Sequence, residues 1–359
     1  MLKELTKDTH TKVRNPYIDI VKFVMALLVV AIHVHPVGGE LGFIIYNVVA
    51  RVADPMFFII TAYFFFTKIK KSAENRGGVD ILKNYIKRIA ILYAAALIIY
   101  SPKIISNCRQ ACDSSLEAIL WLVKRILLQG PYGALWFLTA LFLSITLTFA
   151  STKYLGCRKT ILISFIFYLP AILDTGYGAF FSGFVPMQYF TMFITKVFGW
   201  YANGLTFGFF FCTIGMVFAF EPAKGTLKKD LFFLMLSFAA LFAESHLVRH
   251  YGLGKDYWAL FFLMPVCVYG MKVLLELPKP SFILAFYAKA KLLQEMSVLV
   301  FIFHILFRDC LDIALGSSFG WYYYPPVRYG LVVVSTVIFS ALVIGLSHFD
   351  KFKLLRYLY

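Results

Sequence analysis

The chain has 359 residues, of which 60% are hydrophobic and 18% aromatic, and its mean hydropathy is +0.76. Soluble globular domains are close to half apolar, so this excess excludes an ordinary soluble domain and indicates an integral membrane protein. The formal net charge of +16 does not indicate nucleic-acid binding, because the Lys and Arg residues are spread between apolar segments and form no nucleic-acid-binding motif.

Ten apolar runs, each long enough to cross a bilayer as a helix, follow one another along the chain. They predict an all-α integral membrane protein with a single transmembrane domain over residues 1–359. Two amphipathic stretches, 115–129 and 186–200, are expected to lie at the membrane surface. The predicted spans cover residues 17–37, 43–66, 86–106, 134–152, 160–176, 203–220, 231–247, 256–275, 296–314 and 328–347.

The distribution of positive charge predicts the orientation of these spans. With the N-terminus inside, 24 of the 35 Lys and Arg residues lie in cytoplasmic segments and 9 lie in external ones. Because positively charged residues accumulate in cytoplasmic loops, we expect both termini to be cytoplasmic. The polar first residues are not followed by a convincing signal-peptide cleavage site, so they are expected to be retained.

The six cysteines indicate no metal site, because no Cys/His spacing fits zinc coordination. We therefore expect no metal. Cys108 and Cys112 are the only close pair. A disulfide between them stays open from sequence, with two unpaired thiols as the preferred interpretation.

The first predicted span contains several ionisable residues, which are costly in a bilayer and indicate a functional site. Lys22 and His33 are eleven residues apart, about 20° more than three helical turns, so they share one face with His33 about 16 Å further along. Asp19 lies one turn before Lys22, whereas His35 is rotated away. Asp19 and Lys22 could instead pair or snorkel near the interface, and His33 could be a packed core histidine.

The second predicted span places Arg51 three residues before Asp54, where the two side chains can pair on one helix face. Arg51 is expected at nearly the depth of His33, so its guanidinium could stabilise an oxyanion beside an imidazole. Pro55 can break the helix there and free backbone groups. The alternative is an Arg51–Asp54 pair that serves the structure only.

Three later residues are further candidates. Trp136, in "GPYGALWFLTALFLS", is either an interfacial anchor or a wall of the site. Glu244 lies at the outer end of the seventh predicted span. His304, in "LVFIFHILF", lies mid-span, where packing is the preferred interpretation and catalysis the alternative. No motif of serine hydrolases, nucleotide-binding loops or zinc proteases occurs in the sequence.

These features make the chain resemble the membrane acyltransferase-3 family. That family has ten core spans and a basic residue followed, after ten intervening residues, by histidine; here the pair is Lys22 and His33, with Lys in place of the usual Arg. The family's second-helix pattern, close to FF-x-x-S-G-[FY], corresponds to "FFIITAYFF", with Thr61 and Ala62 replacing Ser and Gly. "LWFL" at 135–138 and "FIFHILF" around His304 complete the resemblance.

The resemblance implies transfer of an acyl group, commonly acetyl from acetyl-CoA, to a hydroxyl of an envelope component or a small molecule, with a hydroxyl on a lipid-linked sugar or envelope glycan as our leading class. His33 would be a general base or would carry the acyl group transiently, and Arg51 would stabilise the oxyanion. Lys22 and Arg88, with the basic segment 68–88, would hold the phosphates of coenzyme A. The protein is then expected in a bacterial-type cytoplasmic membrane, in contact with lipid.

Some members of the family carry a fused soluble SGNH domain that completes the transfer. No such domain is recognised here, so the acceptor is expected to be met in the membrane or through a separate periplasmic or extracellular transferase. The chain also resembles the membrane portion of vancomycin-resistance serine racemases, which predicts a transporter of a serine-like amino acid with Arg51 and Glu244 binding the zwitterion. A catalytically silent envelope scaffold is the third hypothesis.

Overall fold

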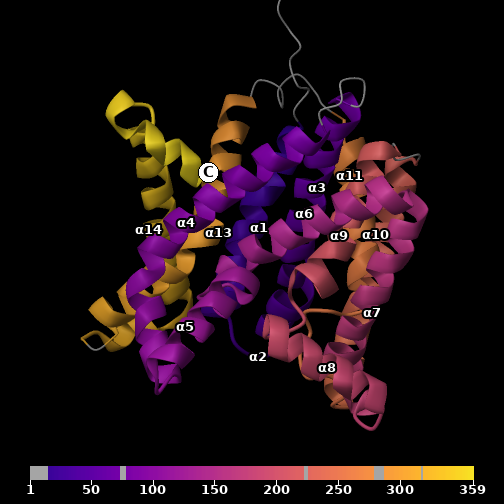
Figure 1. Ribbon diagram of the computed structural model, residues 1–359, viewed down its shortest axis with the longest axis horizontal. Helices are drawn as coiled ribbons and strands as arrows, with labels where there is room; N and C mark the ends of the chain where they lie inside the picture. The colour runs from indigo at the N-terminus through magenta and orange to yellow at the C-terminus, as the bar shows by residue number, and fades with distance from the viewer. Residues whose placement is uncertain (1–14, 73–77, 222–224, 279–286, 317) are drawn as a thin grey trace, which may run out of the picture.

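The computed structural model describes residues 15–72, 78–221, 225–278, 287–316 and 318–359, and all regular structure in these ranges is helical (Figure 1). Seven stretches of this part of the chain are long and apolar enough to cross a membrane. The helices are α1 Pro16–Val34, α2 Gly39–Ile44, α3 Ala53–Ser72, α4 Gly78–Ala111, α5 Ser115–Lys124, α6 Leu135–Leu155, α7 Cys157–Phe181, α8 Val185–Phe198, α9 Phe209–Phe220, α10 Leu227–His250, α11 Leu263–Glu276, α13 Tyr287–Leu315 and α14 Pro325–Leu346.

Each of the ten predicted spans contains one of these helices in the described ranges. The seven that are long and apolar enough correspond to the first five predicted spans, the seventh and the tenth. In the others, α9 and α11 are short, and the C-terminal part of α13 contains Arg308, Asp309 and Asp312. A multi-pass helical membrane architecture is therefore confirmed, whereas the count of ten spans and the cytoplasmic termini stay predictions.

The eighth span begins later than hydropathy predicts. Residues 256–262 are not helical, and α11 starts only at Leu263. The backbone N–H groups of Lys255 and Asp256 donate to the Thr175 carbonyl, at 2.8 and 3.2 Å, which ties this loop to α7. Pro265 then lies in the first turn of α11, where its missing N–H costs no helical hydrogen bond.

The second span is one continuous helical stretch with an irregular middle. A π-helical turn, Ile45–Val49, and a 3₁₀ turn, Ala50–Val52, separate α2 from α3. Both lie immediately before Pro55, whose ring prevents a regular turn over the preceding residues. Arg51 is therefore presented from a distorted turn rather than from a regular helix.

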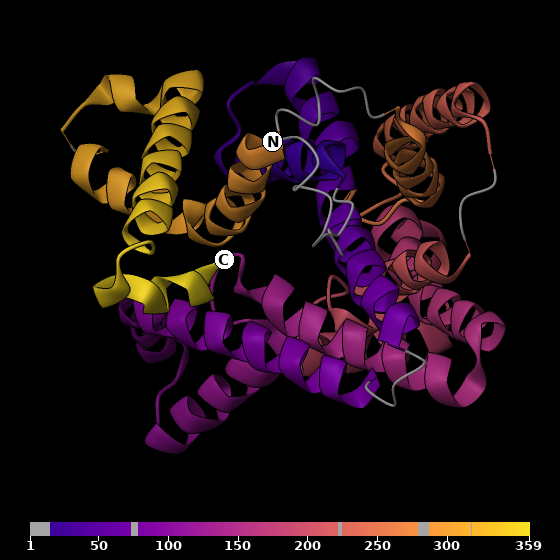
Figure 2. The same cartoon turned by 90° about the horizontal axis from the view of Figure 1, so that it is seen from above.

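The first helix lies in the interior of the bundle. α1 packs along α13 and also contacts α3 and α14 (Figure 2). The two amphipathic stretches are on the outside of the bundle: α5 has no buried residue, and α8 buries only Met187, Ile194 and Phe198, which share one face. Their location at the membrane surface stays a prediction. The short helices α2, α5 and α8 lie at the end of the molecule opposite the C-terminal residue (Figure 1).

Close packing of α3 against α9 depends on glycine. A Cβ atom at Gly215 would overlap the carbonyl oxygen of Ile59 and crowd the backbone nitrogen of Tyr63. Small residues let membrane helices approach closely enough for dispersion contacts along their whole length.

Gly215→Ala is expected to destabilise the protein by about 1–3 kcal/mol, the usual cost of overpacking. The measurement is the midpoint of thermal unfolding in detergent. Gly330→Ala is the matched control, because no atom lies within 4 Å of that Cβ and Ala is the better helix former. Equal midpoints for the two variants would contradict the close α3–α9 contact.

Candidate active site

A pair of histidines from the two ends of the chain lies at the centre of the candidate site. His33, in the last turn of α1, and His304, in α13, have ring centroids 5.2 Å apart, and their planes are inclined by 35°. His304 is fully buried, whereas His33 is half-buried. The packing of α1 along α13 thus joins two residues that the sequence offers separately.

The hydrogen bonds of His304 fix its tautomer. Its Nδ1 lies 3.0 Å from the Val300 carbonyl and 2.9 Å from the Phe301 carbonyl. Carbonyl oxygens only accept, so Nδ1 carries the proton and Nε2 carries a lone pair. Nε2 is buried and has no hydrogen-bond partner among the described residues. A buried acceptor of this kind, beside a second imidazole, is suited to receive a proton.

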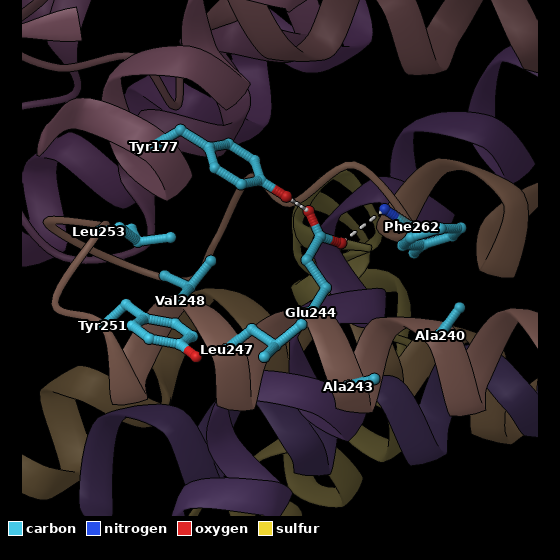
Figure 3. Close-up of a pocket in the computed structure, with 9 residues that line it drawn as sticks. All are labelled: Tyr177, Ala240, Ala243, Glu244, Leu247, Val248, Tyr251, Leu253 and Phe262. Atoms are coloured by element: carbon cyan, nitrogen blue, oxygen red, sulfur yellow. Dashed lines mark hydrogen bonds between the residues drawn. The ribbon is translucent and has the colours of Figure 1, made fainter. Parts of the chain in front are cut away.

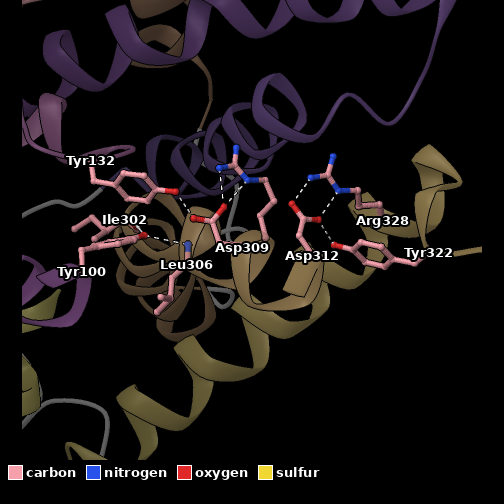
Figure 4. A network of polar contacts seen from close by, with 9 residues as sticks. Tyr100, Tyr132, Ile302, Leu306, Asp309, Asp312, Tyr322 and Arg328 are labelled. Atoms are coloured by element: carbon pink, nitrogen blue, oxygen red, sulfur yellow. Dashed lines mark hydrogen bonds and ion pairs between the residues drawn. The ribbon is translucent and has the colours of Figure 1, made fainter. Parts of the chain in front are cut away.

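Tyr100 from α4 bonds to the backbone of α13 next to His304. Its hydroxyl donates to the Ile302 carbonyl at 2.8 Å and accepts from the Leu306 N–H at 3.1 Å (Figure 4). These two backbone groups are one helical turn apart, on either side of His304. Tyr100 is itself fully buried, so its hydroxyl ties α4 to the backbone on both sides of His304.

Arg51 pairs with Asp256 rather than with Asp54. Its Nη2 donates to Asp256 Oδ1 at 3.0 Å and, weakly, to Asn47 Oδ1 at 3.4 Å. No direct hydrogen bond or ion pair joins Arg51 to Asp54 among the described residues, but the two side chains attract each other through their opposite charges. Arg51 Nε and Asp54 Oδ1 are buried without hydrogen-bond partners among the described residues.

Arg51 and Arg308 both act on His33 through their positive charge. Arg308 lies one turn beyond His304 on α13, and its guanidinium donates to Asp309 Oδ1 at 2.8 and 3.0 Å. Two cations held by carboxylates therefore act on the half-buried imidazole, an arrangement that would favour a developing negative charge nearby.

A polar network at the C-terminal end of α13 was not anticipated from the sequence (Figure 4). Tyr132 donates to Asp309, and burial, reinforced by this contact, raises the pKa of Tyr132 to about 12, so the hydroxyl keeps its proton. Asp312 accepts two hydrogen bonds from Arg328, at 2.9 and 2.6 Å, and one from Tyr322 at 2.6 Å. Charged residues inside an otherwise apolar span, "RDCLD", were the available signal.

Glu244 stabilises the fold near a separate cavity of about 470 Å³ (Figure 3). Its carboxylate accepts from the Tyr177 hydroxyl at 2.5 Å and from the backbone N–H groups of Phe261 and Phe262 at 2.7 and 2.8 Å. It thus fastens α10 to the start of α11 and to α7. The ammonium group of a bound zwitterion would have to compete with these three donors.

The remaining predicted residues lie apart from the histidine pair. Trp136 is half-buried and meets Trp200 edge to face at 5.5 Å, and Trp200 in turn lies 6.2 Å from Trp258. Arg88 is exposed on α4 and donates to the Tyr359 carbonyl at 2.7 Å.

On α1, Asp19 is buried and Lys22 is half-buried. Both lie on the same continuous helix as His33, so the predicted spacing of about 16 Å from Lys22 to His33 holds.

The cysteines and possible metal ligands add no further site. All six cysteines, including Cys108 and Cys112, are free thiols. Within the described ranges, no group of three or more His, Cys, Asp or Glu side chains is placed to hold a metal ion.

Comparison with known proteins identifies the family. The model of an acyltransferase domain matches residues 15–345. The chain belongs to the acyltransferase-3 family. The described residues contain seven helical stretches that are long and apolar enough to cross a membrane. Together with membership in this family, they make the chain a multi-pass membrane acyltransferase-type protein.

The curated relatives that match this chain are named racemases, not acyltransferases. An amino-acid racemase of Enterococcus faecalis is 27% identical to this chain, over 69% of this chain and 34% of the racemase. A second amino-acid racemase of Enterococcus faecalis is 26% identical, over 80% of this chain and 40% of the racemase. A serine/alanine racemase of Enterococcus gallinarum is 24% identical over 71% and 36%. The chain therefore spans between a third and two fifths of these relatives. No solved structure matches.

Glu244→Ala is expected to destabilise the protein by about 1 kcal/mol or more, because two partly buried backbone N–H groups lose their acceptor. Tyr177→Phe, which removes a single hydrogen bond, should cost less. Thermal unfolding in detergent measures both. A Glu244→Ala variant as stable as the wild type would show that the carboxylate does not hold the start of α11.

Proposed function

We propose that the protein is a membrane-embedded O-acyltransferase that moves an acetyl group from cytoplasmic acetyl-CoA to a hydroxyl of an envelope glycan or lipid-linked sugar. The observation that carries the proposal is the ring contact between His33 and His304, whose buried Nε2 has no hydrogen-bond partner among the described residues, inside an acyltransferase-3 chain. Two adjacent imidazoles, one with its tautomer fixed, are suited to proton transfer.

His33 acts as the general base in this proposal. The acceptor oxygen forms a bond to the acyl carbon while the bond from that carbon to sulfur breaks. His33 takes the proton of the acceptor hydroxyl and returns it to the departing thiolate, so no other reactant is needed. A His33 N–H directed at the lone pair of His304 Nε2 would keep the opposite ring nitrogen of His33 free for the hydroxyl.

Arg51 supplies the complementary charge. Its Nε–H has no protein acceptor among the described residues, while Asp256 holds the other end of the guanidinium. A positioned cation of this kind stabilises an oxygen that gains negative charge in the transition state.

The donor would be held at the opposite end of α1. Acetyl-CoA supplies an activated thioester carbonyl and anionic phosphates. Exposed basic residues near the end of α3 and the start of α4 fit those phosphates, and Lys22 lies between this end and His33. The basic residues are Lys68, Lys71, Lys83, Lys87 and Arg88. This arrangement requires that both chain ends face the cytoplasm of a bacterial-type plasma membrane.

The acceptor hydroxyl reaches the site at the membrane, in contact with lipid or with a partner protein. A hydroxyl at the outer end of α1 would come from a membrane-bound or exported glycan, reached directly or through a separate extracytoplasmic transferase. Nucleic acid has no place in this scheme.

A transporter of a serine-like amino acid is the second candidate. The names of the relatives, amino-acid racemase and serine/alanine racemase, favour it. In that case Arg51 would bind the carboxylate of the amino acid, and no acyl donor would be consumed.

Inverted membrane vesicles supplied with labelled acetyl-CoA test the acyltransferase. Wild-type vesicles should move label into membrane or glycan material, and His33→Ala should lower the rate by about 10²–10⁴-fold, the usual contribution of a general base. His304→Ala should also lower the rate. His250→Ala, an exposed histidine on α10, is the control and should transfer normally. Equal rates for wild type and His33→Ala would remove His33 from the chemistry.

Uptake of labelled serine by right-side-out vesicles tests the second candidate. The acyltransferase proposal expects no accumulation above vesicles that lack the protein. Donor-independent accumulation that is lost in Arg51→Ala, together with no acyl transfer by the wild type, would establish the transporter instead.

A further inference from the structure

A second cavity, of about 450 Å³, lies between the C-terminal part of α7, the helix α8 and the loop after α10. Its polar lining comes from all three elements. α8 lies at the end of the bundle opposite the C-terminal residue, next to the end of α7 (Figure 1). The polar residues are Asp174, Ser182, Gln188, Thr191, Thr195 and Lys255.

The polar groups of this cavity are held in a defined arrangement. Asp174 Oδ1 accepts from Lys255 Nζ at 2.8 Å and from the Thr191 hydroxyl at 3.2 Å. Thr191 also shares a hydrogen bond of 2.9 Å with the Tyr201 hydroxyl. Burial raises the pKa of Tyr201 to about 12, so this hydroxyl stays neutral. Asp174 Oδ2 receives no donor from the described residues and is left for a ligand.

The chemistry of the lining selects among ligand classes. The cation in the lining, Lys255, is neutralised by Asp174, so a phosphate or carboxylate gains little there. An acyl chain would leave the hydroxyls, the amide and the carboxylate without water. Gln188 Nε2 already donates to the Ser182 carbonyl and keeps a second N–H. Hydroxyl groups can donate to Asp174 and accept from this N–H, while Phe181 and Met187 offer apolar contacts to the C–H faces of a sugar.

One loop connects this cavity to the candidate active site. Lys255 pairs with Asp174 in the cavity, and the next residue, Asp256, pairs with Arg51. The backbone N–H groups of both residues donate to the Thr175 carbonyl, which fixes the loop between the two sites. Two consecutive residues of one fixed loop thus take part in the cavity and in the Arg51 pair.

We propose that this cavity binds an uncharged sugar unit of the acceptor, adjacent to the unit that becomes acylated. The inference rests on the proposed acyltransferase function and narrows its acceptor to an oligomeric or polymeric glycan rather than a small molecule. Recognition comes from Asp174, Gln188 and Thr191, none of which takes part in the chemical step.

The test measures binding separately from catalysis. The full-length protein in lipid nanodiscs is titrated with labelled neutral oligosaccharides released from the cell envelope. The double variant Asp174→Asn/Gln188→Leu should weaken binding by about tenfold or more, as expected for lost hydrogen bonds to a charged group. Thr191→Val, which keeps the shape of the side chain, should weaken it as well. Lys196→Gln, exposed on α8 and outside the cavity, is the matched control.

The His33→Ala variant distinguishes a failure of the cavity proposal from a failure of the proposed acyltransferase function. Normal oligosaccharide binding by His33→Ala, with binding lost in the cavity variants, supports the site whether or not acyl transfer occurs. In vesicles, the cavity variants should raise the KM for the glycan and leave kcat nearly unchanged. Absent binding by the wild type, or equal binding by the cavity variants and Lys196→Gln, overturns the proposal even if acyl transfer depends on His33.

Discussion

The contact between α1 and α13 is the constraint on which the candidate site depends. It joins His33, close to the start of the chain, to His304, close to its end, and buries the second ring completely. In a bilayer no water is available to satisfy an imidazole, so each ring nitrogen must find a partner in the protein or in a substrate. Two backbone carbonyls satisfy Nδ1 of His304, and Nε2 is left for the partner ring or a ligand.

Several charges around the candidate site follow the same logic. They are paired with a group from another element or from a neighbouring residue, as in Arg51 with Asp256 and Arg328 with Asp312. Removing one member of such a pair leaves an uncompensated charge in a poorly hydrated region, which costs more than the pair itself contributes. The ion pairs therefore specify how the helices and loops meet, while dispersion contacts at residues such as Gly215 supply close packing.

Much of the fold could be predicted from sequence because hydropathy and helix length are local properties. The ionisable residues of the first span also directed attention to His33. Contacts between distant residues could not be predicted in this way: no periodicity links His33 to His304, and the distorted turns before Ala53 redirect Arg51 to Asp256. Glu244 is similar, since its role at the start of α11 became evident only once the loop at 256–262 was known.

The hydrogen bonds of the Tyr100 hydroxyl to the backbone of α13 couple the positions of α4 and α13. α4 is a single helix of 34 residues that carries exposed Arg88 near one end and Tyr100 about 18 Å further along its axis. Because the Tyr100 hydroxyl bonds to two backbone groups of α13, the two helices cannot slide past one another without breaking two hydrogen bonds. α4 therefore links the basic end that carries Arg88 to the backbone that carries His304.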